Sequence, residues 1–191
     1  MEDIEALLQA AGGSAFVYGT SSGAALALEA ASRLEGIEKL ALYEAPFIVD
    51  DSRPPQPPDL IERMSGLIAS NRRGDAVKLF MKIVGVPGIV IALMRVMPVW
   101  SKLTAVAHTL PYDFAILDGN WYGKPLPAKR WASATMPALV AAGGKSPAWM
   151  QNAMHALAGA LPNAQHRTLE RQTHIVKPQV LAPTLADFFA V

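Results

Sequence analysis

The sequence predicts an α/β protein, with a parallel sheet of about four strands that is flanked by helices and interrupted by an all-helical insertion. Short apolar segments alternate with helical ones at both ends of the chain, as in βαβ units. The stretch between them has helical periodicity and no convincing strand. We therefore expect the first half of the core at 1–52, a helical cap at 53–134 and the second half of the core at 135–191.

The first part of the chain reads as helix, strand, helix, strand. Apolar residues at helical spacing predict the two helices, and glycine follows each of them. The two strands are short apolar runs, as strands buried on both faces are. The expected elements are a helix at 4–11, a strand at 15–18, a helix at 23–34 and a strand at 40–43.

The cap is expected to follow a stiff proline-rich linker at 54–58, which cannot join a sheet. Amphipathic helical stretches come next, and the strand–helix alternation returns from Met136. The expected cap helices are 60–71, 75–83 and 104–118, and the later core elements are a strand at 138–142, a helix at 149–161, a strand at 165–169 and a helix at 180–189.

The composition excludes several classes of function. The chain has 17 basic and 16 acidic residues and a formal net charge of +1. No stripe of Lys and Arg is interleaved with aromatics, so we expect no nucleic-acid partner. The absence of cysteine excludes disulfides and thiol chemistry. No grouping of His, Asp and Glu has metal-ligand spacing, and we expect neither a metal nor a cofactor.

Two observations argue against a membrane protein. The most apolar run, at 83–94, is shorter than the roughly 20 residues that span a bilayer. The acidic N-terminus lacks the basic and then apolar order of a signal peptide. We expect no membrane partner and a cytoplasmic location.

The segment Gly19-Thr20-Ser21-Ser22-Gly23 fits the pattern G-x-S-x-G between a predicted strand and a predicted helix. A nucleophile elbow requires this context, because its sharp turn exposes the serine hydroxyl. So tight a turn is expected to leave no room for a Cβ atom at Gly19 or Gly23. It also directs the Ser22 N–H and the helix N-terminus at an oxyanion formed beside Ser21. The alternative is a phosphate-binding or purely structural turn.

A serine nucleophile needs a base, and the chain has four histidines. His108, His155 and His166 fall in the predicted cap, a predicted helix and a predicted strand. His174 follows the last predicted strand, and the loops after parallel strands share one edge of the sheet. His174 is therefore the histidine expected to meet Ser21, and the order Ser then His fits a triad of this type.

With this elbow, this histidine and a helical insertion between them, the chain resembles the α/β-hydrolase superfamily from the helix before the nucleophile strand to its end. It is most similar to bacterial esterase-like or cofactor-free haloperoxidase-like members. The resemblance implies a small-molecule ester held between the sheet edge and the cap. Met94, Met97 and Trp100 are candidates for lining its acyl pocket, although such residues at helical spacing more often serve packing.

The triad acid of most superfamily members follows the next-to-last strand, in the turn that is 143–147 here. That turn has Ser146 at the acid position, and a serine cannot orient an imidazole by charge. In the superfamily's second solution the acid ends the strand after the nucleophile helix, and that position is Glu44. A carboxylate at the mouth of an apolar strand is costly to bury without a partner. Glu44 is the expected acid; Asp50 and Asp118 are weaker substitutes, and a surface glutamate is the alternative reading.

Superfamily members have several strands before the nucleophile strand, whereas one predicted helix precedes it here. The chain is therefore expected to be a fragment, a natural truncation or a weakened enzyme that lacks the second oxyanion N–H. The strand at 15–18 would have an unpaired apolar edge, and such edges recruit partners. We expect a homodimer built on that edge or on the helix beside it.

These residues together predict a serine hydrolase that cleaves a small carboxylic ester through an acyl-enzyme. Ser21 is the expected nucleophile, His174 the base and Glu44 the acid that orients it. Perhydrolysis or lactone hydrolysis on the same triad stays open, because one fold hosts many chemistries. A non-catalytic assembly module is the third possibility.

Overall fold

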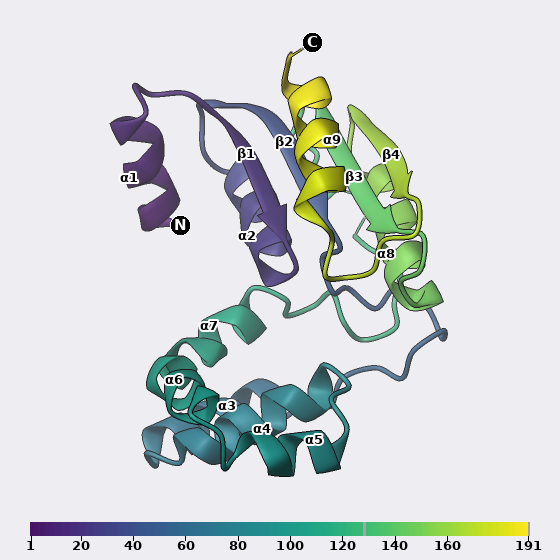
Figure 1. The fold of residues 1–191 in the computed structure, drawn as a ribbon. Coiled ribbons are helices and arrows are strands. Elements are labelled where there is room, and N and C mark those ends of the chain that lie inside the picture. The colour runs from purple at the N-terminus through teal and green to yellow at the C-terminus, as the bar shows by residue number, and fades with distance from the viewer. Residues whose placement is uncertain (128, 191) are drawn as a thin grey trace. The chain divides into compact units, whose positions relative to one another are not determined.

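The computed structural model describes residues 1–127 and 129–190. Its four strands form one sheet in the order β1-β2-β3-β4, and all neighbouring pairs are parallel (Figure 1). The predicted parallel sheet and its strand order are thus confirmed. The strands are β1 (Ala15–Thr20), β2 (Ile37–Tyr43), β3 (Ala138–Gly143) and β4 (Ala164–Leu169).

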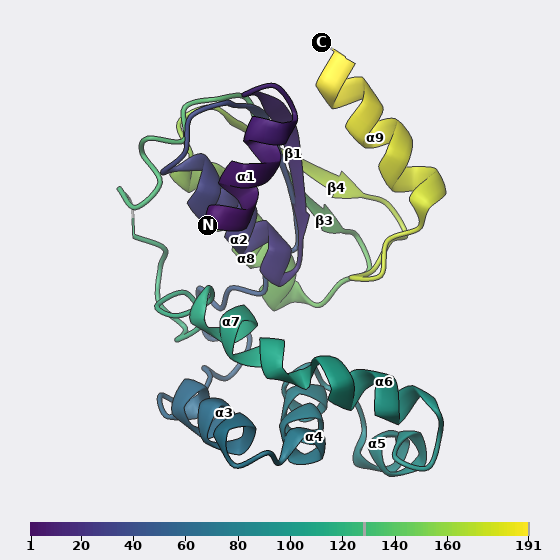
Figure 2. The same ribbon diagram turned by 90° about the vertical axis from the view of Figure 1, so that its left-hand side faces the viewer.

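Helices cover both faces of this sheet (Figure 2). α2 packs against β1 and β2, and α8 packs against β3 and β4. α9 lies on the opposite face, where Phe188 contacts Ala41 and Leu139. Right-handed crossovers between sequential parallel strands put α2 and α8 on the same face. The helices are α1 (Glu2–Ala10), α2 (Ser22–Ala31), α8 (Ala148–Ala160) and α9 (Pro178–Ala190).

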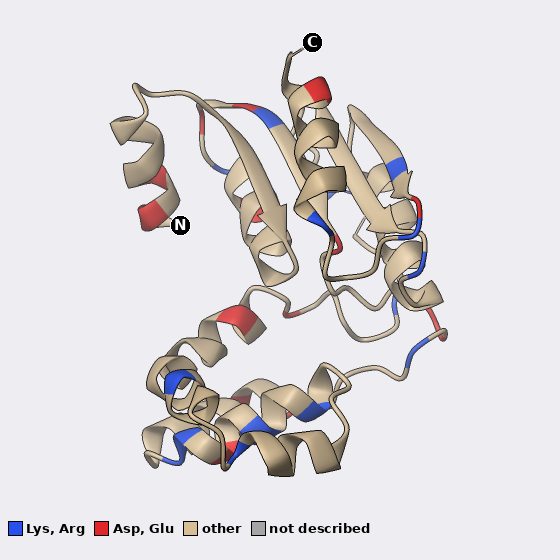
Figure 3. Ribbon diagram, viewed as in Figure 1, with Lys and Arg blue, Asp and Glu red and all other residues tan. Residues whose placement is uncertain are grey.

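The chain divides into two compact units. The core unit comprises Met1–Pro55 and Leu117–Val191, and the helical unit comprises Gln56–Ile116. No described residue of the helical unit belongs to a strand, and both units carry charges of both signs (Figure 3). The helices of this unit are α3 (Leu60–Ala69), α4 (Arg73–Ile83), α5 (Gly88–Met94), α6 (Val99–Val106), the 3-10 helix η1 (Ala107–Thr109) and α7 (Leu110–Ala115).

The helical unit is narrower than the cap expected at 53–134, because the described residues between 117 and 134 belong to the core unit. Trp131 is fully buried and stacks on Phe47 with a centroid distance of 5.9 Å. Its indole N–H donates to Glu29 Oε1 at 2.9 Å, and Arg130 Nε donates to the same oxygen at 2.9 Å. These contacts bind the segment to α2, so it belongs with the sheet.

The single helix expected at 104–118 is divided into α6, η1 and α7. Pro111 stands at the N-terminus of α7, where its missing N–H costs nothing, but its ring prevents a preceding helix from continuing through it. Among the described residues, no single helix is long and apolar enough to cross a membrane. Gly88–Met94 and Val99–Ala115 reach that length and hydropathy only when combined across a 98° bend.

Candidate active site

The sheet register places Ser21 and Glu44 side by side. Thr20 and Tyr43 are paired at the ends of β1 and β2, so Ser21 and Glu44 are the next residues on neighbouring strands. The Ser21 N–H donates to the Tyr43 carbonyl at 2.9 Å. Both residues leave their strands with positive φ, 56° at Ser21 and 49° at Glu44. Such angles are strained for residues with a Cβ and are enriched at functional sites, although Asn71 and Arg171 also have positive φ in this chain.

The turn at Ser21 has the form of a nucleophile elbow, because β1 ends at Thr20 and α2 begins at Ser22. A Cβ on Gly19 would lie 2.4 Å from the carbonyl oxygen of Gly23, so only glycine fits there. A Cβ on Gly23 would meet nothing within 4 Å. The expectation that both glycines are sterically required is therefore right for Gly19 and wrong for Gly23.

The imidazole of His174 bridges the two strand ends. Its Nε2 lies 3.2 Å from Ser21 Oγ, and its Nδ1 lies 2.9 Å from Glu44 Oε2. With the proton on Nδ1, the ring donates to the carboxylate and presents the Nε2 lone pair to the serine hydroxyl. A general base needs this tautomer.

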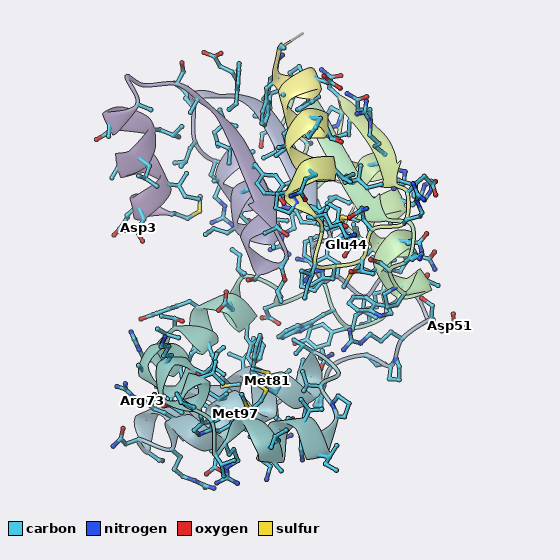
Figure 4. The ribbon with its side chains drawn as sticks, in the orientation of Figure 1. Asp3, Glu44, Asp51, Arg73, Met81 and Met97 are labelled. Atoms are coloured by element: carbon cyan, nitrogen blue, oxygen red, sulfur yellow. The ribbon has the colours of Figure 1, made fainter. Side chains whose placement is uncertain are left out.

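Glu44, which is labelled in Figure 4, is completely buried, and both of its carboxylate oxygens have hydrogen-bond partners. Oε2 accepts from His174, and Oε1 accepts from the Gly143 N–H at 2.7 Å. A buried carboxylate without hydrogen bonds would cost several kcal/mol. The hydrogen bonds from His174 and Gly143 meet that requirement.

The loop that carries His174 is fastened to the ends of β2 and β3. The Tyr43 hydroxyl donates to the Thr173 carbonyl at 2.7 Å, and the Lys145 N–H donates to the Gln172 carbonyl at 2.8 Å. Burial, and secondarily the charge of Glu44, raises the pKa of Tyr43 far above its ordinary value. Its phenol therefore remains a donor throughout the usual pH range.

The other predicted site residues are spread over both units. Ser22 is the first residue of α2, so its N–H lies at the helix N-terminus beside Ser21. Met94 ends α5, Met97 follows it and Trp100 lies in α6, all within the helical unit. Figure 4 labels Met97, which is 48% exposed. The role of these three as pocket residues stays a prediction.

The weaker candidates for the acid have other partners. Asp50 accepts from Ser52 and from Asn152 Nδ2, and Asp118 accepts from the Gly119 N–H and the Tyr122 hydroxyl. The Ser146 hydroxyl is buried and has no hydrogen-bond partner among the described residues.

The remaining histidines have other contacts. His108 contacts the Ala105 carbonyl, and His155 stacks on His166 with ring centroids 4.1 Å apart. In the described parts of the chain, no group of three or more His, Asp and Glu residues could hold a metal ion.

Two residues with clear roles in the geometry were not singled out from the sequence. Gly143 was read as the end of a strand, yet its N–H holds Glu44. A Cβ there would lie 2.6 Å from the Gln172 carbonyl oxygen and 2.8 Å from the Tyr43 hydroxyl. Tyr43 was read as an apolar strand residue. The one available signal was its hydroxyl, which a buried tyrosine usually pairs.

Solved structures identify the family. A crystal structure of an α/β hydrolase from Sphaerobacter thermophilus is 49% identical, with a TM-score of 0.84 over 98% of this chain and 72% of that one. The chain therefore belongs to the α/β-hydrolase family, as the sequence resemblance predicted.

More distant structures share the fold. A hydrolase from Pseudomonas aeruginosa has a TM-score of 0.64 at 21% identity, over 100% of this chain and 70% of its own length. The enol-lactonase of Burkholderia xenovorans has a TM-score of 0.61 at 19% identity, over 99% and 71%. No protein-family model matches the sequence, and no curated protein matches it.

Proposed function

We propose that this chain is a serine hydrolase that cleaves small carboxylic esters, with Ser21 as nucleophile, His174 as general base and Glu44 as the acid that orients it. The observation that carries the proposal is the continuous chain of contacts from Glu44 through His174 to Ser21. Membership of the α/β-hydrolase family supports hydrolysis in general. The ester substrate, the roles of the three residues and a cytoplasmic location go beyond family membership and belong to this proposal.

In the first half-reaction, Ser21 Oγ attacks the ester carbonyl carbon while its proton passes to His174 Nε2. The imidazolium that forms is stabilised by the Glu44 carboxylate on its other nitrogen. The tetrahedral intermediate then collapses, the C–O bond to the alcohol breaks, and His174 returns the proton to the departing alkoxide. An acyl-Ser21 ester and a free alcohol result.

In the second half-reaction, His174 takes a proton from water, and the hydroxide attacks the acyl-Ser21 carbonyl. This intermediate collapses, the C–O bond to Ser21 breaks, and His174 returns the proton to Ser21 Oγ, so that the carboxylic acid is released and the Ser21 hydroxyl is restored. The oxyanion forms next to the N-terminus of α2, where the Ser22 N–H and the helix dipole favour negative charge. One such donor contributes about 3 kcal/mol to the transition state.

A serine-reactive fluorophosphonate probe tests the nucleophile. The wild-type chain should be labelled at Ser21, with the modified peptide identified by mass spectrometry. Ser21→Ala should not be labelled, whereas Ser22→Ala should retain labelling because its backbone N–H is unchanged. Equal labelling of the wild type and Ser21→Ala would exclude Ser21 as the nucleophile.

Lactone hydrolysis needs no change in the triad, because a lactone is a cyclic ester whose leaving alcohol stays attached to the acyl group. Perhydrolysis needs hydrogen peroxide in place of water in the second half-reaction. Assays of p-nitrophenyl esters, simple lactones and peracid formation, each with Ser21→Ala as the blank, separate the three activities. A labelled chain that turns over none of them would favour an assembly module.

A further inference from the structure

We infer that Tyr43 is a positioning residue for the proposed hydrolysis: its buried hydroxyl fixes the backbone before His174, so that the imidazole reaches Ser21 and Glu44 together. The inference rests on the proposed triad and adds a residue whose hydroxyl binds the backbone next to the base. It concerns how the base is held in place, not which groups react.

Tyr43 contacts all three segments that carry the triad. Its carbonyl accepts from the Ser21 N–H at 2.9 Å, and its hydroxyl donates to the Thr173 carbonyl at 2.7 Å. It is also bonded directly to Glu44 along the chain. One buried residue thus connects to Ser21 and Glu44 through its backbone and to the His174 loop through its side chain, all at the end of β2.

The loop around His174 needs such a restraint because little of it is packed. His174 has 39% of its side chain exposed, and the neighbouring Ile175 is 88% exposed. Gln172 is buried, and its carbonyl accepts from the Lys145 N–H. The Tyr43 hydroxyl extends this fastening by one residue, to the peptide group that bears the His174 nitrogen.

The space for the hydroxyl is provided by Gly143. A side chain at this position would place its Cβ 2.8 Å from the Tyr43 hydroxyl oxygen, while the Gly143 N–H binds Glu44. The end of β3 at Gly143 therefore does two things: it leaves room for the Tyr43 hydroxyl, and it binds the Glu44 carboxylate. The ring itself packs against Ala141 and Leu169. Ring and hydroxyl can therefore be tested separately.

Tyr43→Phe keeps the ring and removes only the hydroxyl. Tyr18→Phe is the matched control, because Tyr18 packs against the same cluster but its hydroxyl is hydrogen-bonded to Thr20 and, among the described residues, not to the His174 loop. We expect kcat for ester hydrolysis to fall about 10- to 100-fold in Tyr43→Phe with KM within twofold of wild type, since misplacement of a catalytic group by about 1 Å can cost 10² in rate. Labelling of Ser21 should slow in parallel, and the acid-limb pKa of the kcat/KM profile should shift. Tyr18→Phe should leave all three near wild type.

A size-matched pair guards against a folding defect. Replacing Tyr43 by 4-aminophenylalanine puts an N–H donor in place of the hydroxyl, and turnover should be higher than in Tyr43→Phe. Replacing Tyr43 by 4-fluorophenylalanine fills the same space without a donor, and turnover should stay as low as in Tyr43→Phe. If Tyr43→Phe and Tyr18→Phe lower only the melting temperature, with equal turnover, labelling and pH profiles, the positioning role is excluded while the triad stands. Absence of Ser21 labelling in the wild type would overturn the proposed function itself.

Discussion

Replacement of Glu44 by glutamine tests the proposed acid with almost no change in shape. The glutamine has one acceptor and one donor where the carboxylate has two acceptors. If its oxygen keeps the Gly143 N–H, its amide N–H₂ faces His174 Nδ1. Nδ1 must then accept, the ring proton moves to Nε2, and His174 presents a donor to Ser21 in place of a base.

The size of the loss in kcat/KM follows from the free energy of turning the glutamine amide around, so that its oxygen faces His174. Turning the oxygen toward His174 restores the productive tautomer but places two N–H donors against each other at the 2.7 Å contact with Gly143. A buried unpaired donor costs about 1–3 kcal/mol, so the productive form falls to between about one in 5 and one in 150. A neutral partner also supports the imidazolium less well by about 1 kcal/mol, a further factor of about five. The expected loss of kcat/KM is between about 20-fold and 10³-fold.

Steady-state ester hydrolysis and the rate of Ser21 labelling both measure this loss. Asp118→Asn is the matched control, because it makes the same carboxylate-to-amide change at an exposed residue whose partners are Gly119 and Tyr122. It should stay within about twofold of wild type. Wild-type turnover in Glu44→Gln, or a larger loss in Asp118→Asn, would refute the tautomer argument and move the acid elsewhere.

Three further outcomes are expected. Gly19→Ala should lower the free energy of unfolding by about 1–3 kcal/mol or more, because its Cβ would overlap backbone atoms, whereas Gly23→Ala should be tolerated. Urea unfolding of the two variants measures the difference. A larger loss of stability in Gly23→Ala than in Gly19→Ala would contradict the elbow geometry. Burial, and then the neighbouring His155, lowers the pKa of His166 below its ordinary 6.5, so the unfolded chain binds more protons and stability should fall as the pH drops below about 6.5. His166→Asn should flatten this slope between pH 7.5 and 5.5, and an unchanged slope would assign it to other groups. The homodimer stays a prediction: β1 is an edge strand and Phe16 on it is 46% exposed, so sedimentation at micromolar concentration should show a dimer, and a clean monomer would contradict it.

The features that the sequence could predict depend on local pattern. Short apolar runs, glycines and helical spacing define the strands and the turn at Ser21, and parallel order brings the following loops to one edge. Glu44 was nominated from the superfamily's second position for the acid and supported by the cost of burying a carboxylate; the structure places it fully buried with two hydrogen bonds. Local patterns, together with the family resemblance, thus nominated three residues that lie within hydrogen-bonding distance.

The features that escaped prediction depend on the folded backbone, and two of the three depend on partners far away in the chain. The limit of the helical unit depends on Trp131 and Arg130, which reach Glu29 about a hundred residues earlier. The difference between Gly19 and Gly23 depends on how the first turn of α2 folds back over the strand end. The residue spacing within a sequence motif shows neither the contacts with Glu29 nor the close approach of Gly19 to Gly23. The role of the Tyr43 hydroxyl likewise requires a carbonyl 130 positions away.

The position of the acid follows from the sheet more than from the motif. β2 and β3 are neighbours, with Tyr43 paired to Ala141, so a carboxylate at the end of either strand starts from the same edge. In this chain Ser146 stands in the turn after β3, and the proposed acid, Glu44, follows the adjacent strand β2. The β3 end still contributes, because the Gly143 N–H accounts for the carboxylate oxygen that His174 does not use. The proposed chemistry requires a carboxylate that accepts a hydrogen bond from His174 Nδ1 and whose second oxygen has a partner of its own. The ends of β2 and β3 meet this requirement together, because β2 provides Glu44 and β3 provides the Gly143 N–H.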